Sequence, residues 1–459
     1  MNQKLFMTSE ISSIRDCMEL MDRNKHGIVF ISDNLETCKI IGVLSDGDVR
    51  DALLKDASID DCVEKYYNKN FVWFEKKTPR EAILRSLDNN IKIAPILNED
   101  KTLFDIATRD YLPLQDEKKI YARAKAPARI TFGGGGSDLT HFFIKDNGAV
   151  INATISIYSH AFLKKRQDSV IIIKSLDLDE EWEMSNLEEA LSNSDIKFNL
   201  FKSLLNAIKP SYGFELYIYS DFPKGSGLGG SSVVSAAVIG CFNEFRADKW
   251  DSHDIAEIAF QAERLHMNIA GGWQDQYATV FGGINFIEFK KDRNHIHSLK
   301  LSDKVLCELE ENLLLFKLPK SREVEGDSIH QHQKESMKSK DVNSSVKNAV
   351  KLCYTMKDQL LRGNLTDFGY SLNKAWELKR KFSSKISNKE IDSFYAYAIK
   401  NGALGGKLLG AGGGGFFLFY VKPLDKHFFI KEMKKINLEV SDFLFIKDGM
   451  KSWTMREKD

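Results

Sequence analysis

A glycine-rich segment between a strand-like and a helix-like stretch most constrains how this chain can fold. The segment, Pro223–Ser232, reads Pro-Lys-Gly-Ser-Gly-Leu-Gly-Gly-Ser-Ser. Apolar side chains occupy every second position of 214–218 before it, and apolar and small residues fill most of 233–242 after it, which indicates a strand, a loop and a helix. Glycine lets a backbone approach a phosphate closely, and the N-terminus of a helix favours negative charge. The segment therefore predicts a phosphate-binding loop.

Other interpretations of this loop make different demands on the residues around it. A Walker A loop carries a lysine after its last glycine, whereas Lys224 comes before the glycines here. Gly225, Gly227 and Gly230 satisfy the Gly-x-Gly-x-x-Gly pattern of dinucleotide-binding loops, so a dehydrogenase stays open on this loop alone. A tight turn that packs a helix on a sheet is the purely structural alternative, but it needs fewer glycines and no paired serines.

Two further glycine-rich blocks lie far from this loop in the sequence. Residues 126–138 read Ala-Pro-Ala-Arg-Ile-Thr-Phe-Gly-Gly-Gly-Gly-Ser-Asp, and residues 405–415 read Gly-Gly-Lys-Leu-Leu-Gly-Ala-Gly-Gly-Gly-Gly. Three blocks in this order resemble the GHMP kinases of sugars and small metabolites, and the resemblance runs from Tyr121 to the C-terminus. The third block, together with Trp376–Arg380, looks most like the branch that phosphorylates D-glycero-D-manno-heptose 7-phosphate. A dehydrogenase would explain neither the third block nor the Gln-Asp-Gln stretch around Asp275.

The resemblance implies an α+β fold, a two-domain GHMP kinase preceded by an α/β module. We expect the N-terminal, nucleotide-binding kinase domain at 122–300 and the C-terminal domain at 301–459, after a polar linker at 114–121. The polar stretch 317–340 is either a lid or a solvated helix, of which we favour the helix. An apolar run at 416–421 predicts a strand directly after the third glycine block.

Residues 1–113 contain an internal repeat. Each copy reads as a helix, two strands and a closing helix; the second starts with Thr78 as a helix cap and closes at 102–111. A Gly-Val-Leu-Ser-Asp-Gly-Asp stretch ending at Asp48 resembles the signature of a CBS domain, so the two copies look like a CBS pair (Bateman module). By that resemblance, Ser45 and Asp48 would hold the phosphate and ribose of an adenine nucleotide.

The second copy departs from the signature. When Asp110 is aligned with Asp48, Ala107 stands in the place of Ser45. We therefore expect at most one good nucleotide site in this module. A module that only dimerises or packs on the kinase is the alternative.

The composition excludes several classes of protein. Lys+Arg and Asp+Glu both number 65 among 459 residues, so the zero formal charge carries no signal for nucleic acid. No apolar run approaches the ~20 residues of a membrane span. The N-terminal residues lack the apolar core of a signal peptide, so we expect a cytoplasmic protein. The six cysteines form no Cys-x-x-Cys pair, which favours free thiols.

By resemblance to the family, the Pro223–Ser232 loop binds ATP. The residues assigned to it are Pro223, Lys224, Gly225, Ser226, Gly227, Leu228, Gly229, Gly230, Ser231 and Ser232. Mg²⁺ prefers oxygen ligands and keeps several waters, so one hydroxyl and one carboxylate suffice. The family pattern places them at Ser231 and Glu263. Because Gly230 stands where the family has its first serine, the hydroxyl ligand is open between Ser231 and Ser232.

The catalytic assignments also come from the resemblance. Asp275 matches the family's catalytic aspartate, which takes the proton of the acceptor hydroxyl or fixes its direction. Arg129 matches the galactokinase arginine that faces this aspartate, where it would keep Asp275 charged and stabilise charge on the transferring phosphoryl group. An ordinary ion pair is the structural alternative, and Glu263 could likewise be an exposed helix charge.

The acceptor site is expected around Asp138, which matches the galactokinase aspartate that hydrogen-bonds sugar hydroxyls. The Glu-His that usually precedes it is replaced by Gly135-Gly136, which implies more room. Arg322 and Lys407 are the candidates for binding a phosphate on the acceptor. For the tetraglycine of the third block, a role in packing alone is the alternative. The residues assigned to the acceptor are Gly135, Gly136, Ser137, Asp138, Arg322, Lys407 and Gly413.

Together these features predict a cytoplasmic, Mg²⁺- and ATP-dependent sugar kinase. Its acceptor would be the anomeric hydroxyl of D-glycero-D-manno-heptose 7-phosphate, in nucleotide-activated heptose biosynthesis. A fucose- or other hexose-1-kinase is the alternative within the family, and a non-catalytic sugar and nucleotide sensor is the alternative outside it. We expect a homo-oligomer, a regulatory adenine nucleotide at the CBS pair, and neither a nucleic-acid nor a membrane partner.

Overall fold

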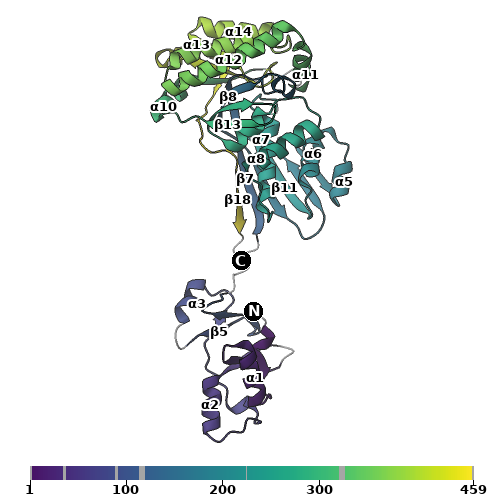
Figure 1. Cartoon of the computed structure of the whole chain (residues 1–459), viewed down its shortest axis with the longest axis vertical. Coiled ribbons are helices and arrows are strands. Elements are labelled where there is room, and N and C mark those ends of the chain that lie inside the picture. The colour runs from purple at the N-terminus through teal and green to yellow at the C-terminus, as the bar shows by residue number, and fades with distance from the viewer. Residues whose placement is uncertain are drawn as a thin grey trace. The chain divides into compact units, whose positions relative to one another are not determined.

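The chain divides into two compact units, residues 1–117 and 118–459 (Figure 1). The computed structural model describes residues 3–34, 38–87, 91–112, 119–223, 225–319 and 326–456. Each unit has hydrophobic core clusters of its own. Within the described ranges, no helix has both the length and the apolar character that crossing a membrane requires.

The first half of the N-terminal unit is a small sheet with two helices. Its elements are β1 (Met7–Ser9), α1 (Ile14–Asn24), β2 (Ile28–Ser32), β3 (Ile40–Ser45) and α2 (Asp46–Leu54). β2 pairs in parallel with β1 and antiparallel with β3. α1 buries Ile14, Cys17 and Met21, the helical spacing of one apolar face, and these residues share a core cluster with Val29 and Leu44.

The second half repeats the strand pattern but not the closing helix. Its elements are β4 (Phe74–Glu75), α3 (Arg80–Ser86), β5 (Ile93–Leu97) and β6 (Leu103–Thr108). The closing helix predicted at 102–111 is wrong, because Leu103 and Ala107 are buried in a strand that pairs with β5. Thr78 is not the cap of α3, which begins after Pro79 without a side-chain capping bond.

The second unit is built on an eight-stranded mixed sheet around a long central strand, β8 (Gly148–Lys165). One edge of β8 pairs with β7 (Lys119–Gly133), and its other edge pairs with β11 (Phe214–Ser220) and β12 (Ile284–Phe289). β7 also pairs with β18 (Lys451–Arg456), so a strand near the C-terminus completes this sheet. The remaining strands are β9 (Ile171–Ser175), β10 (Glu180–Met184) and β13 (Asn294–Ser298).

Helices cover this sheet and carry much of the site. They are α4 (Thr140–Phe143), α5 (Leu187–Ser192), α6 (Asn199–Ile208), α7 (Gly230–Glu244), α8 (Ser252–Phe260) and α9 (Gln274–Phe281). α7 is buried almost throughout and packs on β7 and β8. Its small residues permit this close approach: a Cβ on Gly240 would stand 3.4 Å from the Cβ of Ala124 on β7.

A second, four-stranded antiparallel sheet carries the third glycine block. It contains β14 (Leu313–Lys317), β15 (Ala403–Leu408), β16 (Phe416–Val421) and β17 (Glu439–Ser441). The strand predicted at 416–421 is confirmed as β16. The helices of this region are α10 (Asp303–Asn312), α11 (Gly326–Ser336), α12 (Lys340–Arg362), α13 (Leu365–Arg380), α14 (Lys389–Lys400) and α15 (Lys426–Lys435).

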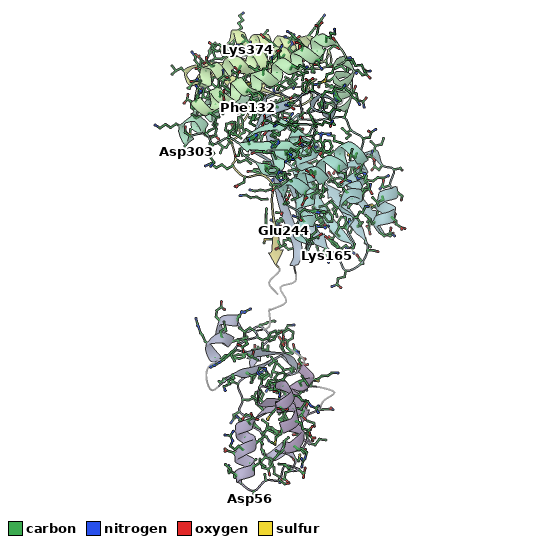
Figure 2. The ribbon with its side chains drawn as sticks, in the orientation of Figure 1. Asp56, Phe132, Lys165, Glu244, Asp303 and Lys374 are labelled. Carbon is green, nitrogen blue, oxygen red and sulfur yellow. The ribbon has the colours of Figure 1, made fainter. Side chains whose placement is uncertain are left out.

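The two sheets share one hydrophobic core, which fixes the glycine blocks relative to one another. Figure 1 shows α12, α13 and α14 gathered into one helical layer. Phe132 of β7 lies in the interior of the unit, while Lys374 projects from the outer side of α13 (Figure 2). The Phe132 ring meets the Phe368 ring of α13 edge-on, with 5.3 Å between centroids. The favoured helix in the polar stretch 317–340 is present as α11, and it is not wholly solvated because Ile329 is buried.

Candidate active site

The predicted phosphate loop leaves β11 and leads directly into α7. Gly225, Gly227 and Gly229 have φ values of +78°, +78° and +86°, a region that favours glycine. Gly229 is the N-cap of α7, and no side chain of the described residues caps that end. The N–H groups in the first turn of α7 are therefore available to donate hydrogen bonds to a phosphate. Lys224 lies outside the described residues.

The third glycine block packs against this loop. A Cβ on Gly410 would stand 2.6 Å from the Cα of Gly227, and a Cβ on Gly415 would stand 2.3 Å from the carbonyl oxygen of Ser226. Lys379 of α13 supports the block by donating to the carbonyl oxygen of Gly410 at 2.5 Å. Glycine is required at both contact positions because any side chain would push the two loops apart.

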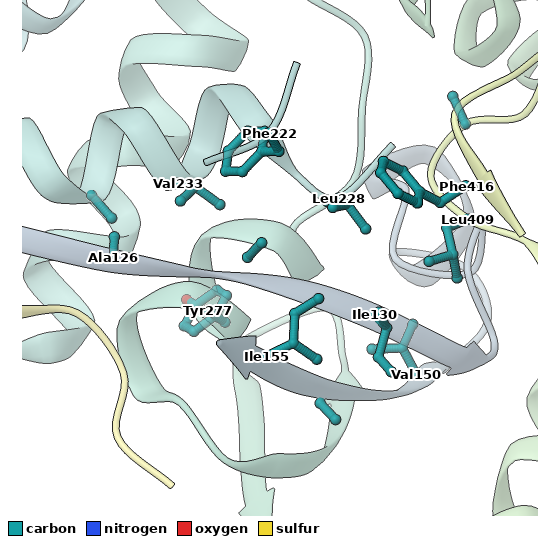
Figure 3. Packing of buried hydrophobic residues seen from close by; sticks show 14 of the residues in the cluster. Ala126, Ile130, Val150, Ile155, Phe222, Leu228, Val233, Tyr277, Leu409 and Phe416 are labelled. Atoms are coloured by element: carbon teal, nitrogen blue, oxygen red, sulfur yellow. The ribbon is translucent and has the colours of Figure 1, made fainter. Parts of the chain in front are cut away.

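The tetraglycine itself also has a packing role. Figure 3 shows Leu228 of the phosphate loop with Leu409 and Phe416, which flank the tetraglycine, among the side chains of the buried cluster. Gly413, a predicted acceptor contact, donates its N–H to the carbonyl oxygen of Ile386 at 2.9 Å. That N–H is thus used within the protein, which supports the packing alternative for this segment.

Arg129, whose side chain is 3% exposed, and Asp275, whose side chain is 20% exposed, form a bidentate ion pair directly beside the phosphate loop. Nε and Nη2 of Arg129 on β7 donate to the two carboxylate oxygens of Asp275 on α9, at 2.8 and 2.7 Å. Nη1 of Arg129 donates to the carbonyl oxygen of Gly227 at 2.7 Å. A Cβ on Gly229 would stand 3.5 Å from the carboxylate of Asp275, so the loop and the carboxylate are in near contact.

The charges around Asp275 keep it ionised. Burial alone would raise the pKa of Asp275, but the Arg129 guanidinium, followed by Arg264 and His330, outweighs burial and lowers this pKa below its usual value. His330 lies on α11, a helix that the sequence did not connect with the site. The carboxylate is therefore an acceptor for a hydroxyl proton, held beside the loop.

Asp138 is a second buried carboxyl, with 3% of its surface exposed. It accepts N–H hydrogen bonds from Gly136 at 2.9 Å and from Gln274 at 3.3 Å. Burial, and then the charge of Asp275, raise the pKa of Asp138. A Cβ on Gly272 would stand 1.8 Å from an oxygen of Asp138, so glycine at 272 lets the Gln-Asp-Gln segment close on this carboxyl. The pKa values of the two carboxyls are thus shifted in opposite directions: Asp275 is favoured in its ionised form and Asp138 in its neutral form.

Ser231 and Glu263 lie together, as metal ligands in these positions would have to. The Ser231 hydroxyl donates to a carboxylate oxygen of Glu263 at 2.6 Å, and Gln276 donates to its other oxygen at 3.1 Å. Glu263 is fully buried, which removes the alternative that it is an exposed helix charge. It lies in a π-helical turn, Gln261–His266, at the end of α8, a distortion often found at functional sites. Ser232 points instead into the interior, where its hydroxyl is buried.

These residues fit a Mg²⁺ ion. One carboxylate and one hydroxyl offer the hard oxygen ligands that Mg²⁺ prefers, and the side-chain oxygen of Gln276 is buried nearby without a hydrogen-bond donor. Among the described residues, no group of three or more His, Cys, Asp or Glu side chains could hold a metal ion. Substrate phosphates and water would have to complete the ligand shell.

The room that Gly136 was expected to leave is filled by a residue that the sequence did not reveal. A Cβ on Gly136 would stand 2.4 Å from Nε2 of Gln333 on α11, and Gly136 has a φ of +97°. Gln333 is 3% exposed, and its Nε2 is buried without an acceptor. Gly135 lies nearest to Gln274, whose Nε2 would be 3.6 Å from an added Cβ.

Ser137, another predicted acceptor contact, has a structural place instead. Its hydroxyl oxygen lies 2.8 and 3.0 Å from the carbonyl oxygens of Gly134 and Ala149, which share its single donor proton, and it accepts the Ala149 N–H at 3.1 Å. The side chain has no exposed surface. Ser137 therefore ties the first glycine block to β8, and its hydroxyl is engaged within the protein, so its contact with the acceptor stays a prediction.

Lys407 lies in the site, whereas Arg322 lies outside the described residues. Lys407 is on β15 and is 3% exposed. Burial lowers its pKa to about 8, and Cys353, Arg129 and Asp138 are the charged or titratable groups that act on it. Lys407 is thus grouped with Arg129 and Asp138.

The CBS signature forms a helix cap. The Ser45 hydroxyl donates to the Asp48 carboxylate at 2.7 Å and accepts the Asp48 N–H at 3.3 Å, and together they make the capping box of α2. The corresponding position in the second half, Ala107, is buried on β6, so no matching cap exists there. The sequence pattern is therefore explained by local structure whether or not a nucleotide binds.

Comparison with known proteins places this fold and site in a family. Residues 199–283 match the N-terminal domain of GHMP kinases, residues 356–435 match the GHMP kinase C-terminal domain, and residues 1–55 match a CBS domain. The D-glycero-alpha-D-manno-heptose 7-phosphate kinase of Campylobacter jejuni is 39% identical over 341 residues, 72% of this chain and 98% of that protein. The chain belongs to the GHMP kinases and is an ATP-dependent sugar kinase with an N-terminal CBS domain.

Solved structures support the same assignment. The crystal structure of a putative sugar kinase from Campylobacter jejuni has a TM-score of 0.61 and 36% identity, and covers 74% of this chain and 99% of its own. The structure of a D-glycero-D-manno-heptose 1-phosphate kinase from Bacteroides thetaiotaomicron also has a TM-score of 0.61, at 26% identity, covering 73% of this chain and 100% of its own. The family and fold expected from the three glycine blocks are confirmed.

Proposed function

We propose that this kinase transfers the γ-phosphoryl group of ATP to the anomeric hydroxyl of D-glycero-D-manno-heptose 7-phosphate. The ion pair of Arg129 with Asp275, held against the phosphate loop, carries the proposal for the chemistry. The acceptor is proposed from the relative of 39% identity, whose name states heptose 7-phosphate as its substrate. The product would be a heptose 1,7-bisphosphate, a precursor for nucleotide activation of the sugar.

In this mechanism the acceptor hydroxyl lies between Asp275 and the phosphate loop. Its oxygen forms a bond to the γ-phosphorus while the bond from phosphorus to the bridging oxygen breaks, and ADP leaves with that electron pair. Asp275 first orients the hydroxyl and takes its proton late, because the low pKa of this carboxylate makes it a weak base for a neutral hydroxyl. Asp138, whose pKa is raised, hydrogen-bonds a neighbouring hydroxyl of the sugar.

We further propose Ser231 and Glu263 as the residues that hold Mg²⁺. When bound, Mg²⁺ neutralises charge on the phosphates of ATP. The chain's own contribution is to hold the Ser231 hydroxyl and the Glu263 carboxylate together, with Gln276 fixing the second carboxylate oxygen. The first turn of α7, which begins at Gly230, holds Ser231 at the end of the phosphate loop, and the π-helical turn after α8 brings Glu263 to it.

A turnover screen tests the proposed acceptor. ADP release is measured with D-glycero-D-manno-heptose 7-phosphate, L-fucose, D-galactose and D-mannose, and Asp275→Asn serves as the inactive control. We expect the heptose phosphate to have the highest kcat/KM by a wide margin. Preference for free fucose or another hexose would reject the heptose 7-phosphate assignment and leave the sugar kinase class intact.

For the N-terminal unit we propose a CBS pair that binds an adenine nucleotide and biases kinase activity. The shared strand pattern of its two halves supports a pair, and the Ser45 and Asp48 cap supports a single site, in the first half. Regulation requires the nucleotide to prefer one conformational state. Calorimetry of the full chain with AMP, compared with Ser45→Ala, tests this. If both proteins bind AMP equally, binding belongs to the kinase site alone.

A further inference from the structure

Arg129 and Lys407 are two cations of the active site, and of these two only Arg129 is neutralised by a carboxylate that it contacts. Arg129 uses Nε and Nη2 for the carboxylate of Asp275 and Nη1 for the carbonyl oxygen of Gly227. Its charge is therefore balanced by the adjacent carboxylate, and its planar fork is oriented by three hydrogen bonds. A guanidinium engaged in this way supports Asp275, but it adds little net positive charge for a further anion.

Lys407 is the second cation. Among the described residues its ammonium has no hydrogen bond or ion pair, and the side chain is 97% buried, as its 3% exposure implies, while the ammonium itself keeps some contact with solvent. An ammonium that burial has largely removed from water is costly when no partner replaces the lost solvation. Such a group is expected where a ligand supplies the missing anion.

The groups that face Lys407 leave its charge uncompensated. Cys353 of α12 has a pKa raised to about 12, so this thiol is neutral near neutral pH. Asp138 is buried, and its raised pKa drives it toward the neutral form. Lys379, on α13 behind β15, directs its ammonium at the carbonyl oxygens of Leu408 and Gly410. Because Arg129 is paired with Asp275, the net positive charge beside Asp138 and Cys353 comes from Lys407.

The strand that carries Lys407 ends beside the phosphate loop. Gly410, three residues later, lies against Gly227, so the end of β15 is anchored to the loop. Arg129 and Asp138, the other charges that act on Lys407, belong to the reacting end of the proposed acceptor. The anomeric oxygen and the 7-phosphate lie at opposite ends of a heptose. The Lys407 ammonium can therefore contact the reacting, anomeric end of the acceptor and not its 7-phosphate.

We propose that Lys407 is a catalytic residue whose ammonium donates to the oxygens of the phosphoryl group during its transfer; this inference rests on the proposed kinase reaction. The acceptor oxygen gains a bond to phosphorus, the bond to the bridging oxygen of ADP breaks, and the hydroxyl proton passes to Asp275. Lys407 keeps its proton throughout. It stabilises negative charge on the transferring group, the role that the sequence had assigned to Arg129.

A pH dependence follows from the burial of this lysine. Because the pKa of Lys407 is lowered to about 8, the ammonium is present at neutral pH and is lost as the pH rises through this value. Bound phosphate would raise the value in the complex. The alkaline limb of kcat/KM, which reports the free enzyme, should therefore lie near pH 8 and belong to Lys407.

The experiment compares Lys407→Met and Lys407→Arg with Lys400→Met, an exposed lysine at the end of α14, as the matched control. With the best acceptor found for the wild type, Lys407→Met should lower kcat by roughly 10²–10³-fold while KM for ATP changes little. Lys407→Arg should recover part of kcat and move the alkaline limb upward, because arginine does not lose its proton in this range. Thermal melting of each variant identifies any that fail to fold.

Several results would overturn the assignment. A rise in the acceptor KM alone would make Lys407 a binding residue, and an alkaline limb unchanged in Lys407→Arg would remove it from the chemistry. If Lys407→Met does not fold, the alkaline limb of kcat/KM in Lys407→Arg tests the assignment instead. Wild-type preference for another sugar rejects the heptose assignment but leaves this test valid on that sugar, whereas no turnover on any sugar rejects both.

Discussion

Replacing Arg129 by methionine isolates the interaction that keeps Asp275 ionised. The change removes two charge-assisted hydrogen bonds, of 2.8 and 2.7 Å, and leaves the carboxyl buried without its counter-ion. Loss of one partner of a buried ion pair typically costs about 3–5 kcal/mol, and the lost bond to Gly227 adds about 1 kcal/mol. We expect the free energy of unfolding at neutral pH to fall by about 4–6 kcal/mol.

The sign of the pH dependence distinguishes this account from simple loss of packing. In the wild type the pKa of Asp275 lies below its usual 3.8, so Asp275 contributes stability above that value, which is lost as the pH falls through the lowered pKa. Without Arg129, burial dominates and the pKa of Asp275 rises above 3.8. The ionised carboxyl then destabilises the variant, so the difference between the two proteins should be larger at neutral pH than near pH 4.

Urea unfolding at pH 7 and pH 4 measures this difference, with Arg123→Met as the control. Arg123 is an exposed arginine of the same strand, β7, and its loss should change stability by about 0.5 kcal/mol or less. The acid limb of kcat/KM should also move to higher pH in Arg129→Met. Equal destabilisation at both pH values, with an unmoved acid limb, would refute the view that Arg129 sets the ionisation of Asp275.

Four further substitutions probe other parts of the site. Asp275→Asn should lower kcat by roughly 10²–10⁴-fold with ATP binding retained, as measured by steady-state kinetics and calorimetry. Glu263→Gln should raise the Mg²⁺ concentration for half-maximal rate by on the order of tenfold, since the anionic ligand is lost while the residue's shape is kept. Gly136→Ala places a Cβ 2.4 Å from Nε2 of Gln333 at a φ of +97°, so the acceptor KM should rise while the KM for ATP stays unchanged. Arg322→Ala should raise KM for a phosphorylated acceptor by roughly 10- to 100-fold if this residue grips the phosphate, and an unchanged KM would remove it from acceptor binding.

Local patterns in the sequence were sufficient to predict the strand and the helix on either side of the phosphate loop. The apolar residues before Pro223 alternate with polar ones, a pattern that is typical of a strand and that predicts β11. The longer run of small apolar residues after Ser232 is typical of a buried helix and predicts α7. The pairing of Arg129 with Asp275 was accessible only through the family resemblance. These residues are 146 positions apart, and no local pattern reports such a contact.

Other features depend on tertiary structure and left no signal in the sequence. α11 appeared only as a polar stretch, since Gln333 and His330 look like surface residues until the fold carries His330 near Asp275 and Gln333 against Gly136. The glycines at 135 and 136 suggested open space, but a side chain from a distant helix occupies it. Ser137 was assigned to the acceptor with the rest of the first glycine block, yet its hydroxyl makes hydrogen bonds with backbone groups of Gly134 and Ala149. In the N-terminal unit, Leu103–Thr108 of the predicted helix 102–111 pairs as a strand because tertiary contacts with β5 override the helical pattern.

The position and nature of the phosphorylated hydroxyl test the central claim most directly. The wild-type enzyme is incubated with ATP and D-glycero-D-manno-heptose 7-phosphate, or with the unphosphorylated heptose, and the product is followed by ³¹P NMR. We expect a second phosphorus signal coupled to the anomeric proton, formed with a kcat/KM at least about 100-fold higher for the phosphorylated acceptor. Phosphorylation at another carbon, or equal rates with both acceptors, would contradict it.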